Sequence, residues 1–266
     1  MSAKIPVVLL FDASALHVQG NNRNLLFARG QRLLSSVGRA EGSRVRVPQE
    51  PLNFNGESCM KYKLADETKE VFGKTLHRIV CVTAFASVSV GEIGGWIETE
   101  KNLNQYGNAW VYGDAEVYGN AKVSGNAKVY GDAEVYGDAE VYGNAEVYGN
   151  AKVYGDAEVS GNAEVYGDAE VYGDAKVSGD AKVSGNAKVS GNAEVFKTSD
   201  YAVYKNTWSS MRYFTWTRSN DMWAVGCFYG TGKELIAKAY KDSELSGKCY
   251  EVVVNMRNEL TKLEQA

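Results

Sequence analysis

Apolar and polar positions recur every six residues through the middle of this chain. Residues 111–194 are fourteen uninterrupted copies of the unit Val-(Tyr/Ser)-Gly-(Asn/Asp)-Ala-(Lys/Glu). Read across unit boundaries, Ala and Val alternate with a charged residue and with Tyr or Ser, so the small apolar side chains share one face of a short strand. The Gly-Asn or Gly-Asp pair turns the chain, because both residue types tolerate positive φ. A four-residue strand cannot bury its apolar face alone, so the repeat predicts stacked coils.

Three such strands per coil predict an 18-residue triangular turn whose interior holds only Val and Ala. With an aliphatic residue first and a small residue fifth, the unit resembles that of the hexapeptide-repeat superfamily, whose fold is the left-handed parallel β-helix. The left hand is implied by the resemblance, since it is an exception to the right-handed crossover rule. A disordered low-complexity segment is the alternative, but disorder does not require a fixed Val.

We expect this register to extend beyond the uninterrupted copies, giving six coils over residues 93–200. The additional inward pairs are Ile93/Ile97, Thr99/Leu103 and Gln105/Ala109 upstream, and Val195/Ser199 downstream.

Each end of the predicted β-helix carries a different pattern. Residues 60–92 are interpreted as a β-rich cap, with strands at 61–64 and 70–82 and a turn near Gly73, because uncapped end strands would pair with other chains. Residues 201–266 are interpreted as a small α+β domain. A hairpin joins 212–217 to 222–225, and Thr231-Gly-Lys-Glu234 is a capping box that opens a helix. Apolar residues then recur at helical spacing, at Cys249, Val252, Val253, Met256, Leu260 and Leu263.

Composition changes near residue 60. The whole chain has a net charge of −4, and all three of its prolines precede that point. Six of ten arginines also precede it, against one of nineteen lysines. We interpret residues 1–59 as a disordered arm or as an upstream extension read from a start codon ahead of the true one, Met60. The run Ile5–Phe11 is too short and too soon interrupted by Asp12 for a typical signal peptide.

The rest of the composition indicates a cytoplasmic protein. No apolar run is long enough to cross a membrane. Four cysteines show no CxxC or zinc-binding spacing, so free thiols in a reducing compartment are expected. These cysteines are Cys59, Cys81, Cys227 and Cys249.

Several segments together resemble a family of uncharacterised phage and prophage hexapeptide-repeat proteins. They are the opening MKYKLADET at Met60, the segment GGWIETEKNL that leads into the repeat, the YGNA units, and GCFYGTGKEL from Gly226. The resemblance covers residues 60–266 and none of 1–59. It implies a phage context, but no reaction and no catalytic residues.

Enzymatic interpretations find little support in the residues. Hexapeptide-repeat acyltransferases resemble one another in a general-base histidine and in loops that interrupt the coils, yet here the histidines are His17 and His77, outside the repeat. Three histidine ligands would be needed for a γ-type carbonic anhydrase. Gly230-Thr-Gly-Lys233 lacks the remainder of a phosphate-binding loop, so a helix start is the better interpretation. We therefore expect no enzyme, catalytic residue, cofactor or metal, with acyltransferase as an alternative.

Residues 18 apart stack directly, so three columns of outward residues run along the coils. Two columns are tyrosine ladders, made of Tyr112, Tyr130, Tyr148 and Tyr166, and of Tyr118, Tyr136, Tyr154 and Tyr172. Serines interrupt the third, which reads Tyr106, Ser124, Tyr142, Ser160 and Ser178. Such ladders stabilise a sheet by about 0.2–1 kcal/mol per pair. Alternatively they form an aromatic surface for binding or self-association, with Trp216 and Trp223 of the C-terminal domain as further candidates.

The residues at the corners of the repeat, and its net charge, limit which ligands the β-helix can bind. Asn108, Asn126, Asn144 and Asn162 form an amide column, whereas Asp138, Asp156 and Asp174 form a carboxylate column that solvent screening or a bound cation could relieve. Residues 111–194 hold six lysines, no arginine and fifteen acidic residues, a net of −9. Binding of double-stranded nucleic acid is therefore not expected. An acidic rod could instead mimic DNA and occupy a DNA-binding protein. The mixed charges along Lys128, Glu146, Glu164 and Lys182 argue against this, because a mimic of DNA would be uniformly negative.

The sequence thus favours a non-enzymatic phage or prophage accessory protein. Its rigid β-helix would present a surface to an unidentified protein partner, with antagonism of host defence as one role. The alternative is a structural or self-assembling component of a phage particle, in which the chain would be a homo-oligomer.

Overall fold

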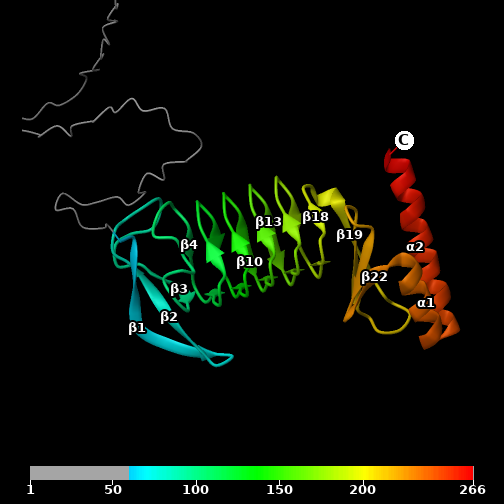
Figure 1. Ribbon diagram of the computed structural model, residues 1–266, viewed down its shortest axis with the longest axis horizontal. Helices are drawn as coiled ribbons and strands as arrows, with labels where there is room; N and C mark the ends of the chain where they lie inside the picture. The colour runs from blue at the N-terminus through cyan, green and yellow to red at the C-terminus, as the bar shows by residue number, and fades with distance from the viewer. Residues whose placement is uncertain (1–59, 266) are drawn as a thin grey trace, which may run out of the picture. The chain divides into compact units, whose positions relative to one another are not determined.

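The computed structural model describes residues 60–265 and confirms the mainly β fold expected from the repeat. About six coils stack into a parallel β-helix, with a β hairpin at one end and a small α+β domain at the other (Figure 1). The predictions for residues 1–59, including His17 and Cys59, lie outside the described part of the chain.

Three parallel sheets form the sides of the β-helix, and each receives one strand from every coil. The first contains β5 (Glu116–Val117), β8 (Glu134–Val135), β11 (Lys152–Val153), β14 (Glu170–Val171) and β17 (Lys188–Val189). The second contains β4 (Trp110–Val111), β7 (Lys128–Val129), β10 (Glu146–Gly149), β13 (Glu164–Gly167) and β16 (Lys182–Val183). The third contains β6 (Lys122–Val123), β9 (Glu140–Val141), β12 (Glu158–Val159), β15 (Lys176–Val177) and β18 (Glu194–Val195).

The interior of the coils is made of the repeat's Val and Ala residues, all of which are buried. The corner glycines explain why the turns repeat so strictly. Gly137, for example, has φ of 75°, and a Cβ there would lie 2.9 Å from the backbone nitrogen of Gly155 on the next coil. A side chain would therefore be strained by its own φ and would also clash with the neighbouring turn.

Upstream of Ala109 the register differs from the prediction by two residues. Ile97 pairs with Val117 and Leu103 is bridged to Val123, 20 residues apart, whereas Val111 pairs with Val129, 18 apart. Two extra residues therefore lie between Leu103 and Val111. Ile93 and Thr99 are consequently exposed, and the expectation that they point inward was wrong.

Gln105, within this insertion, is not an inward residue of the coil but holds the N-terminal cap. Its Oε1 accepts hydrogen bonds from the backbone nitrogens of Lys61 (2.9 Å) and Tyr62 (3.2 Å), and its Nε2 donates to the Tyr62 carbonyl (3.2 Å). The predicted inward position of Ser199 was also wrong. That residue is exposed within the short 3-10 helix η1 (Thr198–Asp200).

The N-terminal cap extends the first sheet of the β-helix. Antiparallel strands β1 (Tyr62–Val71) and β2 (Lys74–Cys81) form a hairpin, β2 pairs with β3 (Ile93–Ile97), and β3 runs parallel to β5. The predicted turn at Gly73 is confirmed, while β1 is longer than expected. Tyr62, Ile79 and Trp110 are fully buried in the same core as the coils, so cap and β-helix form one hydrophobic unit.

The C-terminal domain is a four-stranded antiparallel sheet packed against two helices. The sheet runs in chain order through β19 (Tyr201–Lys205), β20 (Tyr213–Thr217), β21 (Met222–Val225) and β22 (Phe228–Thr231). Helix α1 (Gly232–Asp242) begins at the predicted capping box: the Thr231 hydroxyl accepts from the Glu234 nitrogen, and Glu234 Oε2 accepts from the Thr231 nitrogen at 2.8 Å. Helix α2 (Glu244–Gln265) follows after one residue.

The two ends of the coils have opposite hydrogen-bonding needs, because each coil donates its backbone N–H groups to the carbonyls of the next. The first coil is left with free carbonyls, and the N-terminal region supplies donors. Lys61 Nζ donates to the Ala109 carbonyl (2.8 Å), Tyr62 to that of Leu103 (2.6 Å), and Asn102 Nδ2 to those of Gly119 and Ala121.

The last coil is left with free N–H groups, and the C-terminal region supplies acceptors. Four side-chain hydroxyls accept hydrogen bonds from backbone nitrogens of the final strands. The pairs are Thr198 with Lys182 (3.3 Å), Tyr201 with Ser184 (3.2 Å), Thr215 with Lys188 (2.8 Å), and Ser219 with Glu194 (2.7 Å). These backbone groups of the end coils are thereby satisfied within the chain, which opposes pairing of the coil ends with another chain.

Candidate interaction surfaces

The second tyrosine ladder is a continuous stack on the first sheet of the β-helix. Rings of Tyr118, Tyr136, Tyr154 and Tyr172 lie 4.9 to 5.0 Å apart, with planes within 4° of parallel. Its first member, Tyr118, is only 5% exposed because it packs against Leu76 and Trp96 of the N-terminal region. This ladder therefore ends in a buried contact rather than in an open aromatic face.

The first ladder is shorter than predicted. Tyr130, Tyr148 and Tyr166 stack at 4.7 and 4.9 Å. Tyr112, expected as the fourth member, instead contacts the Trp110 indole edge-on, with 6.5 Å between ring centroids. A hollow of about 350 Å³ is lined by Tyr112, Tyr130 and the ion pair of Lys128 with Glu146.

Four of the ladder hydroxyls, those of Tyr118, Tyr130, Tyr148 and Tyr154, donate to glutamates of the repeat. Tyr130 and Tyr148 donate to Glu146 and Glu164 at 3.0 Å, and Tyr154 donates to Glu170 at 3.2 Å. Burial, followed by the hydrogen bond to Glu164, raises the pKa of Tyr148 to about 12. The pKa values of Tyr118, Tyr130, Tyr136 and Tyr154 are also raised, chiefly by burial. These contacts support a stabilising role for the ladders.

Charged side chains link the coils in the same way. Each of the six lysines in the repeat forms an ion pair with a glutamate one coil away, at 2.6 to 3.1 Å. Because these pairs are partly exposed, each contributes little to stability. They do neutralise the lysines, so the surface left to a partner is acidic and unsuited to phosphate.

The predicted asparagine column is confirmed: Asn108, Asn126, Asn144 and Asn162 are joined by side-chain hydrogen bonds of 2.9 to 3.0 Å. In the carboxylate column, Asp138 accepts a hydrogen bond from Asn120 at 2.9 Å. Within residues 60–265, no group of three or more His, Cys, Asp or Glu side chains is arranged to hold a metal ion.

Trp216 and Trp223, predicted as surface recognition residues, are core residues. They are 2% and 1% exposed, because they pack between the C-terminal sheet and the helices. Trp216 Nε1 donates to Asp221 at 2.7 Å, and the Arg257 guanidinium lies 4.6 Å from the indole centroid. The expectation of an exposed patch at these two positions was therefore wrong.

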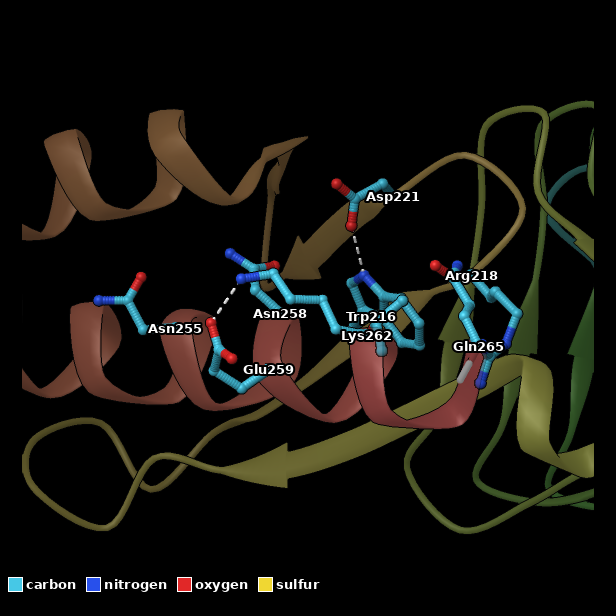
Figure 2. A pocket seen from close by; sticks show the side chains of 9 residues that line it. Trp216, Arg218, Asp221, Asn255, Asn258, Glu259, Lys262 and Gln265 are labelled. Atoms are coloured by element: carbon cyan, nitrogen blue, oxygen red, sulfur yellow. Dashed lines mark hydrogen bonds and ion pairs between the residues drawn. The ribbon is translucent and has the colours of Figure 1, made fainter.

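A polar pocket of about 640 Å³ opens beside Trp216 (Figure 2). Its walls come from the turn after β20 and from one side of α2, and they carry mainly amide and charged groups. Lys262 is paired with Glu259 across the pocket wall at 2.6 Å (Figure 2). The lining thus supplies hydrogen-bonding groups and charges of both signs.

Helix α2 presents an apolar stripe to solvent, which the sequence interpretation did not anticipate. Its buried face is made of Ser246, Gly247, Tyr250, Val254 and Arg257. Gly247 permits the close crossing with α1, since a Cβ there would lie 2.2 Å from the Tyr240 ring. The exposed side chains are Leu245 (61%), Val252 (67%), Met256 (43%), Leu260 (39%) and Leu263 (72%).

These five side chains form a single stripe, because at 3.6 residues per turn they fall within about 80° of the helix circumference. The helical spacing of Val252, Met256, Leu260 and Leu263 was correctly predicted, but the sheet packs against a different face. Cys249, half-buried, lies along the same stripe with a free thiol. An exposed apolar stripe of this length marks an interaction surface more often than a free one.

His77 lies in the N-terminal hairpin, paired with Thr68 and Ile97, and is not at a boundary between coils. No helix within residues 60–265 is long and apolar enough to cross a lipid bilayer. No protein-family model matches the chain, and no curated protein is significantly similar to it.

Proposed function

We propose that this protein is a non-enzymatic interaction module in which a rigid β-helix carries a C-terminal docking helix. The observation that supports it best is the apolar stripe of α2, where five side chains between 39% and 72% exposed lie in one line. Apolar area of this kind gains about 25 cal/mol per Å² when a partner covers it. The ligand is a protein with a complementary apolar surface, consistent with recognition of an amphipathic helix.

The capped coil edges support this proposal over a self-assembling particle component. Coils of separate chains would stack through the backbone N–H and C=O groups of their end coils. At the last coil, side-chain hydroxyls accept hydrogen bonds from these N–H groups. At the first coil, amine, amide and phenol groups donate to the carbonyls. The four ladder hydroxyls that are bonded to glutamates also offer little to a partner. The resemblance of residues 60–266 to phage and prophage proteins supports an accessory role in an infected or lysogenic bacterium, with a host or phage protein as the partner.

The test compares the full chain with a variant carrying Val252→Glu and Leu263→Glu, both at strongly exposed positions. The matched control, Asn255→Glu with Asn258→Glu, places two new carboxylates on the same helix but outside the stripe, at the polar pocket. Light scattering measures self-association, and capture from host lysate measures partner binding. Loss of the captured protein in the first variant alone supports the proposal.

A dimer dispersed by the first variant alone would assign the stripe to a second copy of the chain. Absence of both partner and dimer for the unmodified protein would refute the proposal. Binding of acetyl-CoA, measured by calorimetry, would instead favour the acyltransferase alternative.

A further inference from the structure

The interrupted column on the third sheet has serine in place of a ring at positions 124, 160 and 178, and position 124 lies beside the N-terminal insertion. Ser124 donates its backbone N–H to the Val141 carbonyl at 3.0 Å, which places Tyr142 one strand further along the column. Asn104 donates to the Val123 carbonyl at 2.9 Å and so occupies the position one strand before Ser124. The register shift thus puts Asn104, not Tyr106, in the column.

The missing ring leaves a pocket. A cavity of about 490 Å³ lies over Ser124, walled by Tyr142 on one side and by Asn104, Gln105 and Tyr106 on the other. Val123, whose side chain is buried in the interior of the coil, and Leu103 also line it. The two-residue insertion that anchors the N-terminal cap therefore also closes one end of this rung, so the space takes a single ring and not a stack.

Tyr142 has a free face on which an aromatic ring can stack. It is 37% exposed, more than the tyrosines of either ladder, and no other ring stacks on it within the described residues. Its hydroxyl is held by Glu158 at 3.2 Å, which fixes the plane of the phenol. On the neighbouring sheets, rings one strand apart stack at 4.7 to 5.0 Å. A ring placed over Ser124 would contact Tyr142 at the same spacing, within the favourable range for aromatic pairs.

The charges around the pocket select a neutral ring. Lys122 and Glu140 at its edge pair with each other at 2.9 Å, and the remaining charged residues, Glu100 and Lys101, are of opposite sign. The pocket also opens to solvent along the outer face of the sheet, so a free small molecule would leave much of its surface uncovered. A ring attached to a polypeptide gains further contact with the surrounding sheet.

We propose that the pocket over Ser124 binds one neutral aromatic side chain, a Trp, Tyr or Phe, of a partner polypeptide, stacked on Tyr142. This site is separate from the stripe on α2 and does not depend on the function proposed above. It would give the β-helix a directional contact at a rung where no ring of the chain stacks on Tyr142.

The test uses the full chain and a capped pentapeptide, acetyl-Gly-Thr-Trp-Thr-Gly-amide, with ¹³C-labelled tyrosine rings observed by NMR. Ser124→Tyr restores the rung and fills the pocket, and Tyr already occupies this repeat position in nine of fourteen copies. Ser160→Tyr, on the other side of Tyr142, is the matched control. We expect titration shifts at the Tyr142 ring, a loss of about tenfold or more in affinity in Ser124→Tyr, and little change in Ser160→Tyr.

Equal binding by both variants would overturn the proposal, because the peptide would then sit elsewhere. Equal binding of a peptide with Leu in place of Trp would overturn it too, since stacking would not be involved. No binding by the unmodified protein would refute it outright. Val252→Glu with Leu263→Glu is expected to bind the Trp peptide normally, so failure of this proposal is distinguishable from failure of the docking function of α2.

Discussion

The Thr215 hydroxyl accepts a hydrogen bond from the backbone N–H of Lys188, with 2.8 Å between Oγ1 and N. Lys188 lies on β17, the last strand of the first sheet, and has no following coil to receive its N–H. Thr215 belongs to β20 of the C-terminal domain and is 1% exposed. A side chain of the C-terminal domain thus completes the backbone hydrogen bonding of the β-helix. This contact joins the domain to the β-helix and ends the first sheet.

Thr215→Val should destabilise the protein by about 1–3 kcal/mol, because it leaves a buried N–H without an acceptor. Thr215→Ser keeps the hydroxyl, so it should lower the free energy of unfolding by much less. Ser219→Ala removes the equivalent bond to Glu194 at an exposed position, where water can replace it. Urea denaturation measures all three variants. Similar losses in the Val and Ser variants at position 215 would show that packing, not the hydrogen bond, matters there.

Tyr148→Ser should lower the free energy of unfolding by about 1–3 kcal/mol, because it removes two stacked pairs of roughly 0.5–1.5 kcal/mol each. Tyr148→Phe keeps both stacks and loses only the hydrogen bond to Glu164, so its loss should be smaller. Thermal or urea unfolding distinguishes the two variants. If Phe were as damaging as Ser, the hydroxyl network rather than ring stacking would hold the ladder together.

Alkaline pH should weaken the ladder. Folding raises the pKa of Tyr148 from an ordinary value of 10.0 to about 12, so the unfolded chain loses its proton first. The contribution of Tyr148 is then complete below pH 10 and disappears as the pH rises through 12. Unfolding free energies measured between pH 9 and 12 should fall less steeply in Tyr148→Phe than in the unmodified protein. Parallel curves would contradict the assignment.

Lys61 should give the opposite dependence at lower pH. Burial lowers its pKa from 10.5 to about 8, so between these values the unfolded chain binds the additional proton. Stability should therefore rise by about 1 kcal/mol from pH 8 to pH 9 through this group. The range stops at 9 because the neighbouring Cys81 thiol, whose pKa is raised by burial, opposes the trend above it. Lys61→Met should remove the rise in urea denaturation, and an unchanged slope would exclude Lys61 as its source.

The number of coils should be adjustable in steps of 18 residues. Deleting residues 147–164 removes one whole coil and leaves every column in register, so the protein should still unfold cooperatively and keep its partner. Deleting residues 147–155 instead breaks the six-residue phase and exposes the inward Val and Ala positions. Circular dichroism and thermal unfolding compare the two. A full-coil deletion that unfolds the protein or abolishes partner binding would show that length itself is required.

The six-residue period by itself determined the coils, their inward Val and Ala positions, the asparagine column and much of the ring stacking. This was possible because each unit makes the same contacts as its neighbours, so local periodicity carries the tertiary information. The capping box at Thr231 and the hairpin at 213–225 were likewise predictable, since their signals are confined to a few adjacent residues.

Only the tertiary structure decided the features that depend on distant segments. The insertion at Gln105 contacts the backbone of Lys61 and Tyr62, which no periodicity reveals. The burial of Trp216 and the exposure of Leu263 depend on which face of α2 meets the sheet. A helical pattern shows that apolar residues share a side, but the close crossing at Gly247 determined which side is covered. The pocket over Ser124 arises in the same way, from a short side chain in one coil and an insertion in the preceding one.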